Sequence, residues 1–350
     1  MGISVLFLRG GGLKGFGKRS LGHTYNDIIS LENLCLAWED FIVGKKKKMD
    51  VIKFGQNLMD NIVELHTDLV NRTYCHGGYK SFYITDPKRR HIHKASVKDR
   101  LLHHAIYRIL YPFFDCTYIF DSYSCRNDKG THRAINRFNQ IARQVSRNNS
   151  RTCWVLKCDI KKFFASINQE ILIYILQEYI TDKEIIWLLK NVIASFNTDT
   201  QVGVGLPLGN LTSQLFSNIY MNRFDQWVKH VLKAKYYVRY ADDFVFLSED
   251  KKYLESIISQ VQSFLQINLK LSLHPDKLFL KTIASGVDFL GWVHFPNHRV
   301  LRTKTKQRMF RNIQKSMSKE SLQSYFGLIR HGNSQKLLKS VVWEDWLWQK

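Results

Sequence analysis

The sequence has 350 residues, of which 45% are hydrophobic, enough for one large domain or for two to three subdomains. It carries 52 Lys and Arg against 30 Asp and Glu, a formal net charge of +22. This excess predicts a polyanionic partner, because each phosphate that the protein neutralises releases counterions. The basic residues are spread along the chain rather than gathered on one amphipathic helix, which favours nucleic acid over a membrane surface.

The cysteines and the hydropathy exclude several further classes of protein. The six cysteines include no CxxC pair and no zinc-site spacing, so we interpret them as reduced thiols in a cytosolic protein. The apolar run at residues 3–8 is too short for a secretory signal, and no run approaches the roughly 20 apolar residues that span a bilayer. We therefore expect a soluble, cytoplasmic protein without a membrane partner.

Residues 1–25 are predicted to form a flexible basic leader. Within it, Gly12–Lys18 almost fits a phosphate-binding loop, but Arg19 stands where Ser or Thr must ligate magnesium. No strand and helix surround this stretch in the predicted order. We therefore interpret the segment as a linker or disordered arm.

The first half of the chain is predicted to be mainly helical. Apolar residues recur at helical spacing from residue 26, with Leu31, Leu34 and Trp38 on one face. Two further helices are predicted at residues 54–69 and 101–110. Between them, residues 79–95 have the pattern of strand, turn and strand, with Asp86-Pro87 at the turn.

The second half predicts an alternating pattern of strands and helices. A strand is expected at 154–160, helices at 169–180, 183–195 and 212–232, and a hairpin at 236–240 and 244–248. A helix at 250–266 and strands near 269–273 and 277–281 follow. Without the inserted helices, this order is β-α-β-β-α-β, the split ferredoxin-like unit of an α+β fold.

This topology predicts a site made of three carboxylates. In such a sheet the first strand lies beside the central hairpin, so Asp159 would lie next to Asp242 and Asp243. Three acids among many Lys and Arg suit two Mg²⁺ ions about 3.5–4 Å apart that act on phosphates, with Mn²⁺ as a substitute. The alternative is a solvated turn plus an unrelated aspartate at a strand end.

Five motifs in order resemble the palm of reverse transcriptases, over roughly residues 80–295: DIKKFFASI, LPLGNLTSQ, YADD, HPDKLFL and VDFLGW. Upstream, VKDRLLHHAI and DSYSCRNDKGTHRAI resemble the fingers of bacterial enzymes related to group II introns. The resemblance implies an RNA-directed DNA polymerase with a right-hand fold and a two-metal mechanism. The implied divisions are N-terminal helices and fingers at 26–150, a palm at 151–295 with a helical insertion at about 169–200, and a thumb at 296–350.

The resemblance also implies roles for the residues at the metal site. Asp159 and Asp242 would bridge both metals and Asp243 would support the catalytic one, with Ile160 as a further metal-binding position. Lys277 matches the lysine that protonates the leaving pyrophosphate.

Other motif positions would bind the nucleotide and the primer. Phe164 falls where the family carries an aromatic gate that excludes a 2′-OH; the alternative is one more core aromatic beside Phe163. Lys88 and Arg90 would contact the triphosphate, or they are solvated turn charges. The turn Phe289, Leu290 and Gly291 matches the primer grip. The basic stretch after residue 300 suits a thumb helix along a duplex, although a plain amphipathic helix would look much the same.

One loop departs from the common family pattern of Gln-Gly-x-x-x-Ser-Pro. Here Leu208 replaces the first Gln, Gly209 is kept and Gln214 replaces the Pro. This pair resembles reverse transcriptases of diversity-generating retroelements, which make errors at template adenines. The loop would lie near the nascent base pair, where the loss of a polar side chain leaves only apolar contacts. Apolar contacts distinguish a correct from an incorrect nucleotide by only about 1–3 kcal/mol per group.

The resemblance implies partners and leaves alternatives open. The expected partners are a structured template RNA, a cDNA or primer strand, dNTPs and a small, basic, oligomeric accessory protein, in a bacterial, archaeal or phage setting. The chain after Gly291 has room for a thumb and not for an RNase H, endonuclease or maturase region. The alternatives are a defence-associated or retron-type reverse transcriptase of ordinary fidelity, a non-catalytic RNA-binding descendant and an RNA-templated RNA polymerase.

Overall fold

The computed structural model describes residues 19–85, 88–198, 201–315 and 319–333, together with 335, 338 and 339. The chain divides into two compact units. The first consists of Met1–Phe120, Ile160–Lys233 and Val261–Leu273, and the second of Asp121–Asp159, Ala234–Gln260 and His274–Lys350. The predicted leader lies outside the described residues up to residue 18.

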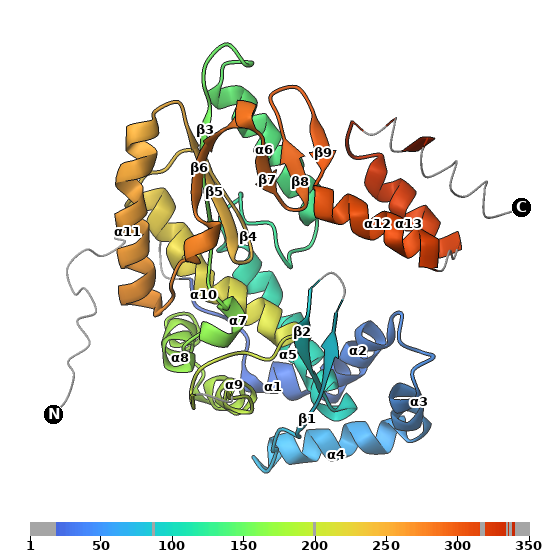
Figure 1. The fold of residues 1–350 in the computed structure, drawn as a ribbon. Coiled ribbons are helices and arrows are strands. Elements are labelled where there is room, and N and C mark those ends of the chain that lie inside the picture. The colour runs from blue at the N-terminus through green and yellow to red at the C-terminus, as the bar shows by residue number, and fades with distance from the viewer. Residues whose placement is uncertain are drawn as a thin grey trace, which may run out of the picture. The chain divides into compact units, whose positions relative to one another are not determined.

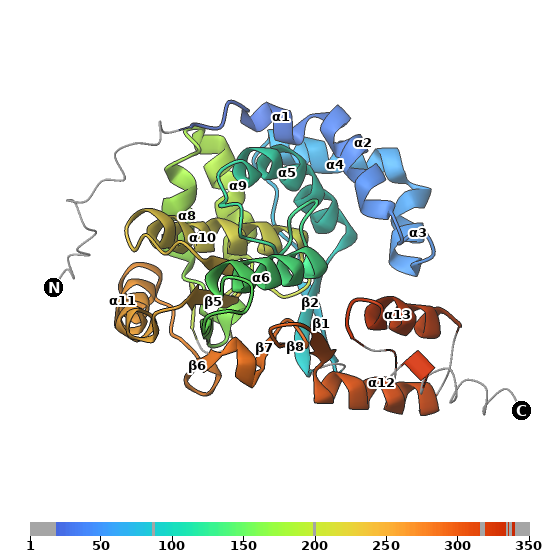
Figure 2. The ribbon, with the colours of Figure 1, turned by 90° about the horizontal axis from the view of Figure 1, so that it is seen from above.

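The first unit begins with helices, as the apolar spacing predicts. They are α1 (Tyr25–Ile29), α2 (Leu31–Ile42), α3 (Met49–Gln56), α4 (Leu58–Val70) and α5 (Val97–Asp115). Side-chain oxygens of Ser30 and Ser96 cap α2 and α5 by accepting from backbone amides in the first turn. Helices α1, α2, α4 and α5 lie side by side in Figures 1 and 2. The single helix expected at 54–69 is wrong, because the chain leaves helical geometry at Asn57 and separates α3 from α4.

A two-stranded hairpin follows α4 in the same unit. Strands β1 (Tyr79–Ile84) and β2 (Arg90–Ala95) pair antiparallel, from Tyr79 opposite Ala95 to Ile84 opposite Arg90. This confirms the expected strand, turn and strand, while the Asp86-Pro87 turn lies outside the described residues. The hairpin thus carries Lys88 and Arg90 at its exposed tip.

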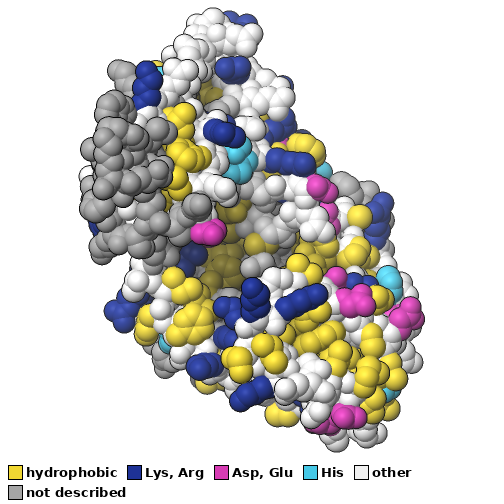
Figure 3. All heavy atoms as spheres, turned by 90° about the vertical axis from the view of Figure 1, so that its right-hand side faces the viewer, with side chains coloured by type: hydrophobic (Ala, Val, Ile, Leu, Met, Phe, Trp, Pro, Cys, Tyr) yellow, Lys and Arg dark blue, Asp and Glu magenta, His cyan; other side chains and the backbone are white. Residues whose placement is uncertain are grey.

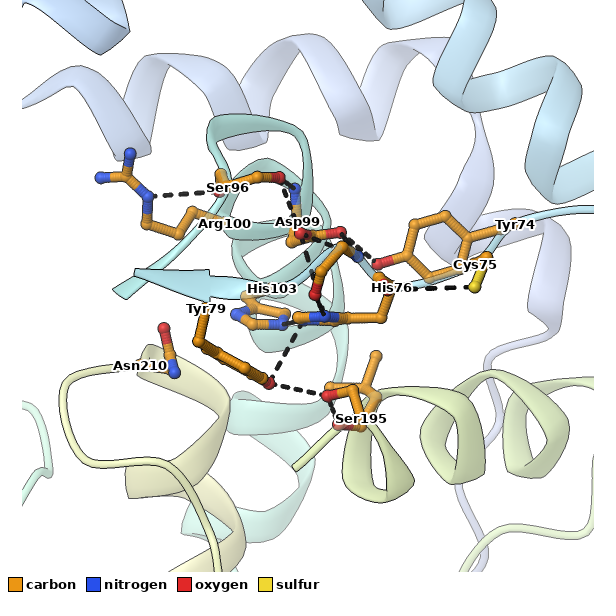
Figure 4. A network of polar contacts seen from close by, with 12 residues as sticks. Tyr74, Cys75, His76, Tyr79, Ser96, Asp99, Arg100, His103, Ser195 and Asn210 are labelled. Carbon is orange, nitrogen blue, oxygen red and sulfur yellow. Dashed lines mark hydrogen bonds and ion pairs between the residues drawn. The ribbon is translucent and has the colours of Figure 1, made fainter. Parts of the chain in front are cut away.

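A buried polar network ties the base of this hairpin to α5 (Figure 4). Asp99 accepts hydrogen bonds from the hydroxyls of Tyr74 at 2.8 Å and Ser96 at 2.6 Å. The Nε2 atoms of His76 and His103 lie 3.2 Å apart. His103 is 1% exposed, and burial, with a smaller effect of His76, lowers its pKa to about 3. The network therefore requires a neutral imidazole at His103.

The rest of the first unit is helical and contains the Gly-rich loop. The helices are α7 (Phe163–Ser166), α8 (Gln169–Gln177), α9 (Lys183–Ala194) and α10 (Leu211–His230). The last three were expected from the sequence. The loop at 201–210 connects α9 to α10, apart from residues 199 and 200, which the structure does not describe.

The second unit contains a four-stranded sheet with the predicted ferredoxin-like order. Strands β3 (Trp154–Asp159), β4 (Tyr237–Tyr240), β5 (Asp243–Ser248) and β6 (Phe279–Thr282) lie in the order β4-β5-β3-β6, and all neighbours are antiparallel. Helix α11 (Lys251–Leu269) lies between β5 and β6 in the sequence. A strand at 269–273 is wrong: α11 continues to Leu269, and only an isolated bridge joins Leu273 to Ile160.

Helix α6 (Thr131–Val145) covers part of one face of this sheet. Its apolar side, which includes Ala134, Phe138 and Ile141, packs with Val155 of β3 and Leu247 of β5 in one buried cluster. Figures 1 and 2 show α6 beside β4 and β5. Since side chains alternate along a strand, Val155 and Asp159 project from the same face. Helix α6 therefore covers the same sheet face from which Asp159 projects, at the end of β3 away from Asp159.

A second, three-stranded sheet and two helices complete the second unit. Strands β7 (Val287–Phe289), β8 (Trp292–His294) and β9 (Arg299–Leu301) form a meander, followed by α12 (Thr303–Lys315) and α13 (Lys319–Ile329). Trp292, Leu301, Met309 and Ile329 share a core with Ile135 of α6. Among the described residues, no helix is both long and apolar enough to cross a membrane.

Candidate active site

Two adjacent strands bring the three predicted carboxylates together. Asp159 ends β3 and lies directly opposite Asp243, the first residue of β5. Asp242 precedes it in the two-residue loop between β4 and β5, which the pair Tyr240 and Asp243 closes. Ala241 adopts φ 55°, a left-handed conformation that costs a non-glycine residue energy and is common where a tight turn serves a site.

Two lysines lie against these carboxylates. The Lys157 Nζ atom is 3.1 Å from Asp243 Oδ1, and the Lys277 Nζ atom is 2.7 Å from Asp159 Oδ1. A 3₁₀ turn at Pro275–Lys277 carries Lys277, and the His274 amide holds this turn to β3 by donating to the Asp159 carbonyl at 2.7 Å. The structure therefore places Lys277 against Asp159 at the end of β3.

Burial and neighbouring charges change the ionisation of Asp243. Together they raise the pKa of its carboxyl to about 6: burial, the largest cause, raises the pKa, Lys157 opposes the shift, and the charges of Asp159 and Asp242 add to it. Like charges that share a site disfavour full ionisation unless a cation compensates them. The ammonium groups of Lys157 and Lys277 supply part of that compensation.

The donor set fits a divalent metal ion. Carboxylate oxygens are the ligands that Mg²⁺ prefers, together with oxygens of a phosphate substrate. Within the described residues, no group of three or more His, Cys, Asp or Glu is gathered closely enough to hold a metal on its own. The Ile160 side chain is buried, so only its backbone carbonyl could contribute. Asp159, Asp242 and Asp243 are therefore the residues that would hold the ion, with substrate oxygens completing its shell.

In the first unit, the Gly-rich loop gathers three of the predicted nucleotide-binding residues. The Leu206 amide donates to the Phe164 carbonyl at 2.8 Å, and the His93 amide of β2 donates to the Leu208 carbonyl at 3.0 Å. Gly209 follows with φ 108°, and a Cβ atom there would lie 2.9 Å from Ile92 Cγ2. Phe164 is thus joined to the loop, and Leu208 and Gly209 contact the hairpin strand β2.

The two phenylalanines of the DIKKFFASI motif differ in burial. Phe163 is 3% exposed and belongs to the core, whereas Phe164 is partly exposed. Their rings meet edge to face, with centroids 5.3 Å apart. Of the two, Phe164 is the ring that a bound molecule could reach.

The remaining predicted positions are distributed over both units. Gln214 is exposed in the first turn of α10, and Lys88 and Arg90 are exposed on the hairpin. The primer-grip turn joins β7 to β8, with Leu290 at φ 51° and Gly291 at φ 86°. Positive φ at both central residues defines a type I′ turn, in which Leu290 is strained.

Sequence reasoning missed two residues that support the carboxylates. Lys157 lies two positions before Asp159, so strand alternation alone would have placed both on one face. Arg239 is fully buried and donates to the Ala241 carbonyl at 3.1 Å and the Ser122 hydroxyl at 3.0 Å. It braces the loop that carries Asp242. No local signal marks Arg239, because Ser122 is distant in sequence.

Comparisons with known proteins identify the family of the chain. The family described as reverse transcriptase (RNA-dependent DNA polymerase) matches residues 85–294, more than half of the chain. The chain therefore belongs to the reverse transcriptase family.

Two curated relatives and one solved structure show the extent of the similarity. YkfC of Escherichia coli K12 is 24% identical over 255 residues, which cover 63% of this chain and 65% of YkfC. The COX1/OXI3 intron 2 protein of Saccharomyces cerevisiae is 23% identical over 222 residues, 46% of this chain and 25% of that protein. A structure of apo telomerase from Candida Tropicalis, truncated from its C-terminal domain, aligns with a TM-score of 0.47 at 14% identity over 68% of this chain and 59% of that one. The chain thus spans less than two thirds of these relatives' lengths.

Proposed function

We propose that the chain is an RNA-directed DNA polymerase that transfers deoxynucleotides to a primer. The observation that carries the proposal is the pairing of Asp159 with Asp243 beside the Asp242 loop, with Lys157 and Lys277 against them. Three crowded acids flanked by cationic side chains suit chemistry on a polyphosphate.

In this proposal each residue at the strand ends has a task. The three aspartates hold divalent ions, which when bound would neutralise developing charge and orient the attacking 3′-OH and the leaving pyrophosphate. Lys277 Nζ lies 2.7 Å from Asp159 Oδ1, and we assign it the donation of a proton to the leaving group. Lys157 keeps the Asp243 carboxylate charged against the effect of burial.

Phe164, Leu208 and Gly209, which we call the loop cluster of the first unit, would select the nucleotide. Phe164 offers a partly exposed ring, and a flat ring under the sugar leaves no space for a 2′-OH. Lys88 and Arg90 on the hairpin would contact the triphosphate. We assign the β4-β5-β3-β6 sheet to the palm, β1 and β2 to the fingers, α12 and α13 to the thumb and the turn at Leu290 to the primer grip.

We further propose that the enzyme belongs to a diversity-generating retroelement and copies template adenines with errors. The support is the pair Leu208 and Gln214, because an aliphatic side chain at the loop offers no hydrogen bond that rewards correct base-pair geometry. The proposed partners are a structured template RNA and a small, basic, oligomeric accessory protein. The basic side chains that Figure 3 shows among hydrophobic ones, rather than in a single patch, suit affinity spread over a long nucleic acid.

Primer extension on a defined RNA template with Mg²⁺ and dNTPs tests the activity. We expect Asp242→Ala to lower synthesis by at least about a thousand-fold, because losing a metal ligand removes several kcal/mol of transition-state stabilisation. RNA binding should change little. Asp276→Asn is the matched control, since its side chain is 88% exposed on the turn that carries Lys277. Polymerisation retained in Asp242→Ala would refute the metal assignment.

Sequencing of the same products tests the retroelement assignment. Errors clustered opposite template adenines would support it. Accurate products would place the enzyme with defence-associated or retron-type reverse transcriptases.

A further inference from the structure

The segment from Lys129 to Arg151 is strongly basic and rich in amides. It contains six Lys and Arg, six Asn and Gln, and no Asp or Glu. Soluble surfaces normally mix both signs of charge. One side of α6 is buried in the core of the second unit, and the exposed side of this helix presents mainly cationic and amide groups and no carboxylate.

This exposed side borders a cavity of about 630 Å³, a size that suits a small ligand or one nucleotide. Its lining consists of five amides and three arginines, with no acid: Asn136, Asn139, Gln140, Arg143, Gln144, Arg147, Asn148 and Arg299. A second hollow of about 310 Å³ shares Asn139, Arg143 and Arg299 and extends the cavity toward β8 and β9. Every lining residue belongs to the second unit.

The arginines of this segment differ in whether they are neutralised. Arg137 pairs with Asp121 at 2.8 Å, and Arg151 pairs with Glu249 at 3.1 Å. The exposed side chains of Arg143 and Arg147 have no ion pair or hydrogen bond with the residues that the structure describes. Of the three arginines that line the cavity, Arg143 and Arg147 are therefore left free for an external anion, and a guanidinium can form two bonds to phosphate oxygens.

At least one amide in the lining is oriented by the protein. Arg299 Nη1 donates to Asn136 Oδ1 at 2.9 Å, and because a guanidinium can only donate, this contact fixes the oxygen of Asn136 toward Arg299. The amide NH₂ is then left as a donor. Asn139 is held by His294, whose Nδ1 lies 2.8 Å from Oδ1. Amides held in place and combining donors with acceptors suit the edges of unpaired bases.

An aromatic pair lines the adjoining hollow. The rings of Phe295 and His298 stack with centroids 4.8 Å apart and planes 13° apart, and His298 is exposed. Flat rings beside a basic groove stack with bases in single strands, which a duplex cannot offer because its bases are already stacked.

We propose that this cavity binds a single-stranded segment of RNA, with Arg143 and Arg147 on its phosphates and the amides on its base edges. The inference rests on the proposed function, since the RNA would be the molecule that the enzyme copies. A basic accessory protein is disfavoured as the occupant because the lining would repel it. The site would hold a single-stranded part of the template that is not being copied at that moment.

Fluorescence anisotropy with a labelled, unstructured oligoribonucleotide tests the site on the full chain. We expect R143Q/R147Q to weaken binding at least about 10-fold and to lower the slope of log K against log salt by about 1.4, since each phosphate contact with a single strand contributes about 0.7. The control R151Q removes one positive charge, from a neutralised position, and should change affinity less than about 2-fold. R143K/R147K keeps the positive charges but loses the guanidinium groups that form two bonds to a phosphate, and it should bind with intermediate affinity.

Three results would overturn the inference. They are wild-type affinity in R143Q/R147Q, an equal loss in R151Q, and an equal loss for a blunt RNA duplex. Thermal melting shows whether the variants fold, and if R143Q/R147Q does not, R143K/R147K carries the test.

Primer extension on a short primer–template whose template strand extends only a few nucleotides beyond the primer separates this inference from the proposed function. Equal rates of synthesis by the wild type and R143Q/R147Q, together with weaker binding of single-stranded RNA by the variant, support both the polymerase and the RNA site. No synthesis by the wild type, with the binding loss still present, would show that the chain does not polymerise without its proposed accessory protein and would leave the RNA site standing.

Discussion

Protonation of His103 should make the first unit unstable in mild acid. Its folded pKa of about 3 lies below the ordinary value of 6.5, so the stability that depends on neutral His103 is fully present above pH 6.5. It is lost as the pH falls from 6.5 toward 3. Over the 1.5 pH units from 6.5 to 5, the loss is about 2 kcal/mol, at 1.36 kcal/mol per unit.

Melting curves of the wild type and of His103→Gln at pH 7 and pH 5 measure this loss. For a unit of this size, about 2 kcal/mol corresponds to about 4–8 °C. Between pH 7 and pH 5, the melting temperature of the wild type should fall by about 4–8 °C more than that of His103→Gln. His104 and His294, whose pKa values burial lowers to about 4, are present in both proteins and cancel in the comparison. Equal losses in the two proteins would show that His103 does not carry the effect.

Two further changes test the loop cluster. Phe164→Ala should raise ribonucleotide incorporation in primer extension, whereas Phe163→Ala should destabilise the fold without changing sugar selection; unchanged selection in Phe164→Ala would place the gate elsewhere. Gly209→Ala should lower the free energy of unfolding by about 1–3 kcal/mol because of the positive φ, and by more because the new Cβ would lie 2.9 Å from Ile92 Cγ2. It should also lower kcat/KM. Gly203→Ala, at φ 74° with nothing within 4 Å, carries the backbone cost alone, so equal losses of activity would refute a role for the contact.

Strong periodicity made most of the fold predictable. The apolar stripes of α9 and α10 and the β-α-β-β-α-β order follow from local patterns. The break at Asn57 and the continuation of α11 to Leu269 could not be predicted in this way. Apolar residues on both sides of Asn57 keep the helical spacing, and those at 269–273 alternate over too short a stretch to distinguish a strand from a helix. The meander of β7, β8 and β9 was missed, since strands of three residues leave almost no pattern.

The candidate site was predictable where motif and topology coincide. Placing Asp159 beside Asp243 required only the order of the strands, and the ion pair of Lys277 with Asp159 agrees with its motif position. The bracing by Arg239 and the unpaired state of Arg143 and Arg147 depend on which distant side chains arrive nearby. Sequence spacing carries no record of such contacts.

The attachments of the Gly-rich loop leave position 208 free to vary. Leu206 and Leu208 are fastened to Phe164 and His93 through main-chain amides and carbonyls, and these bonds are the same for any side chain. A mutation from Gln to Leu at 208 would therefore alter what the loop presents without moving the loop. Under the proposed function, copying accuracy would then depend on the side chain at this one position, while the main-chain bonds that hold the loop stay the same.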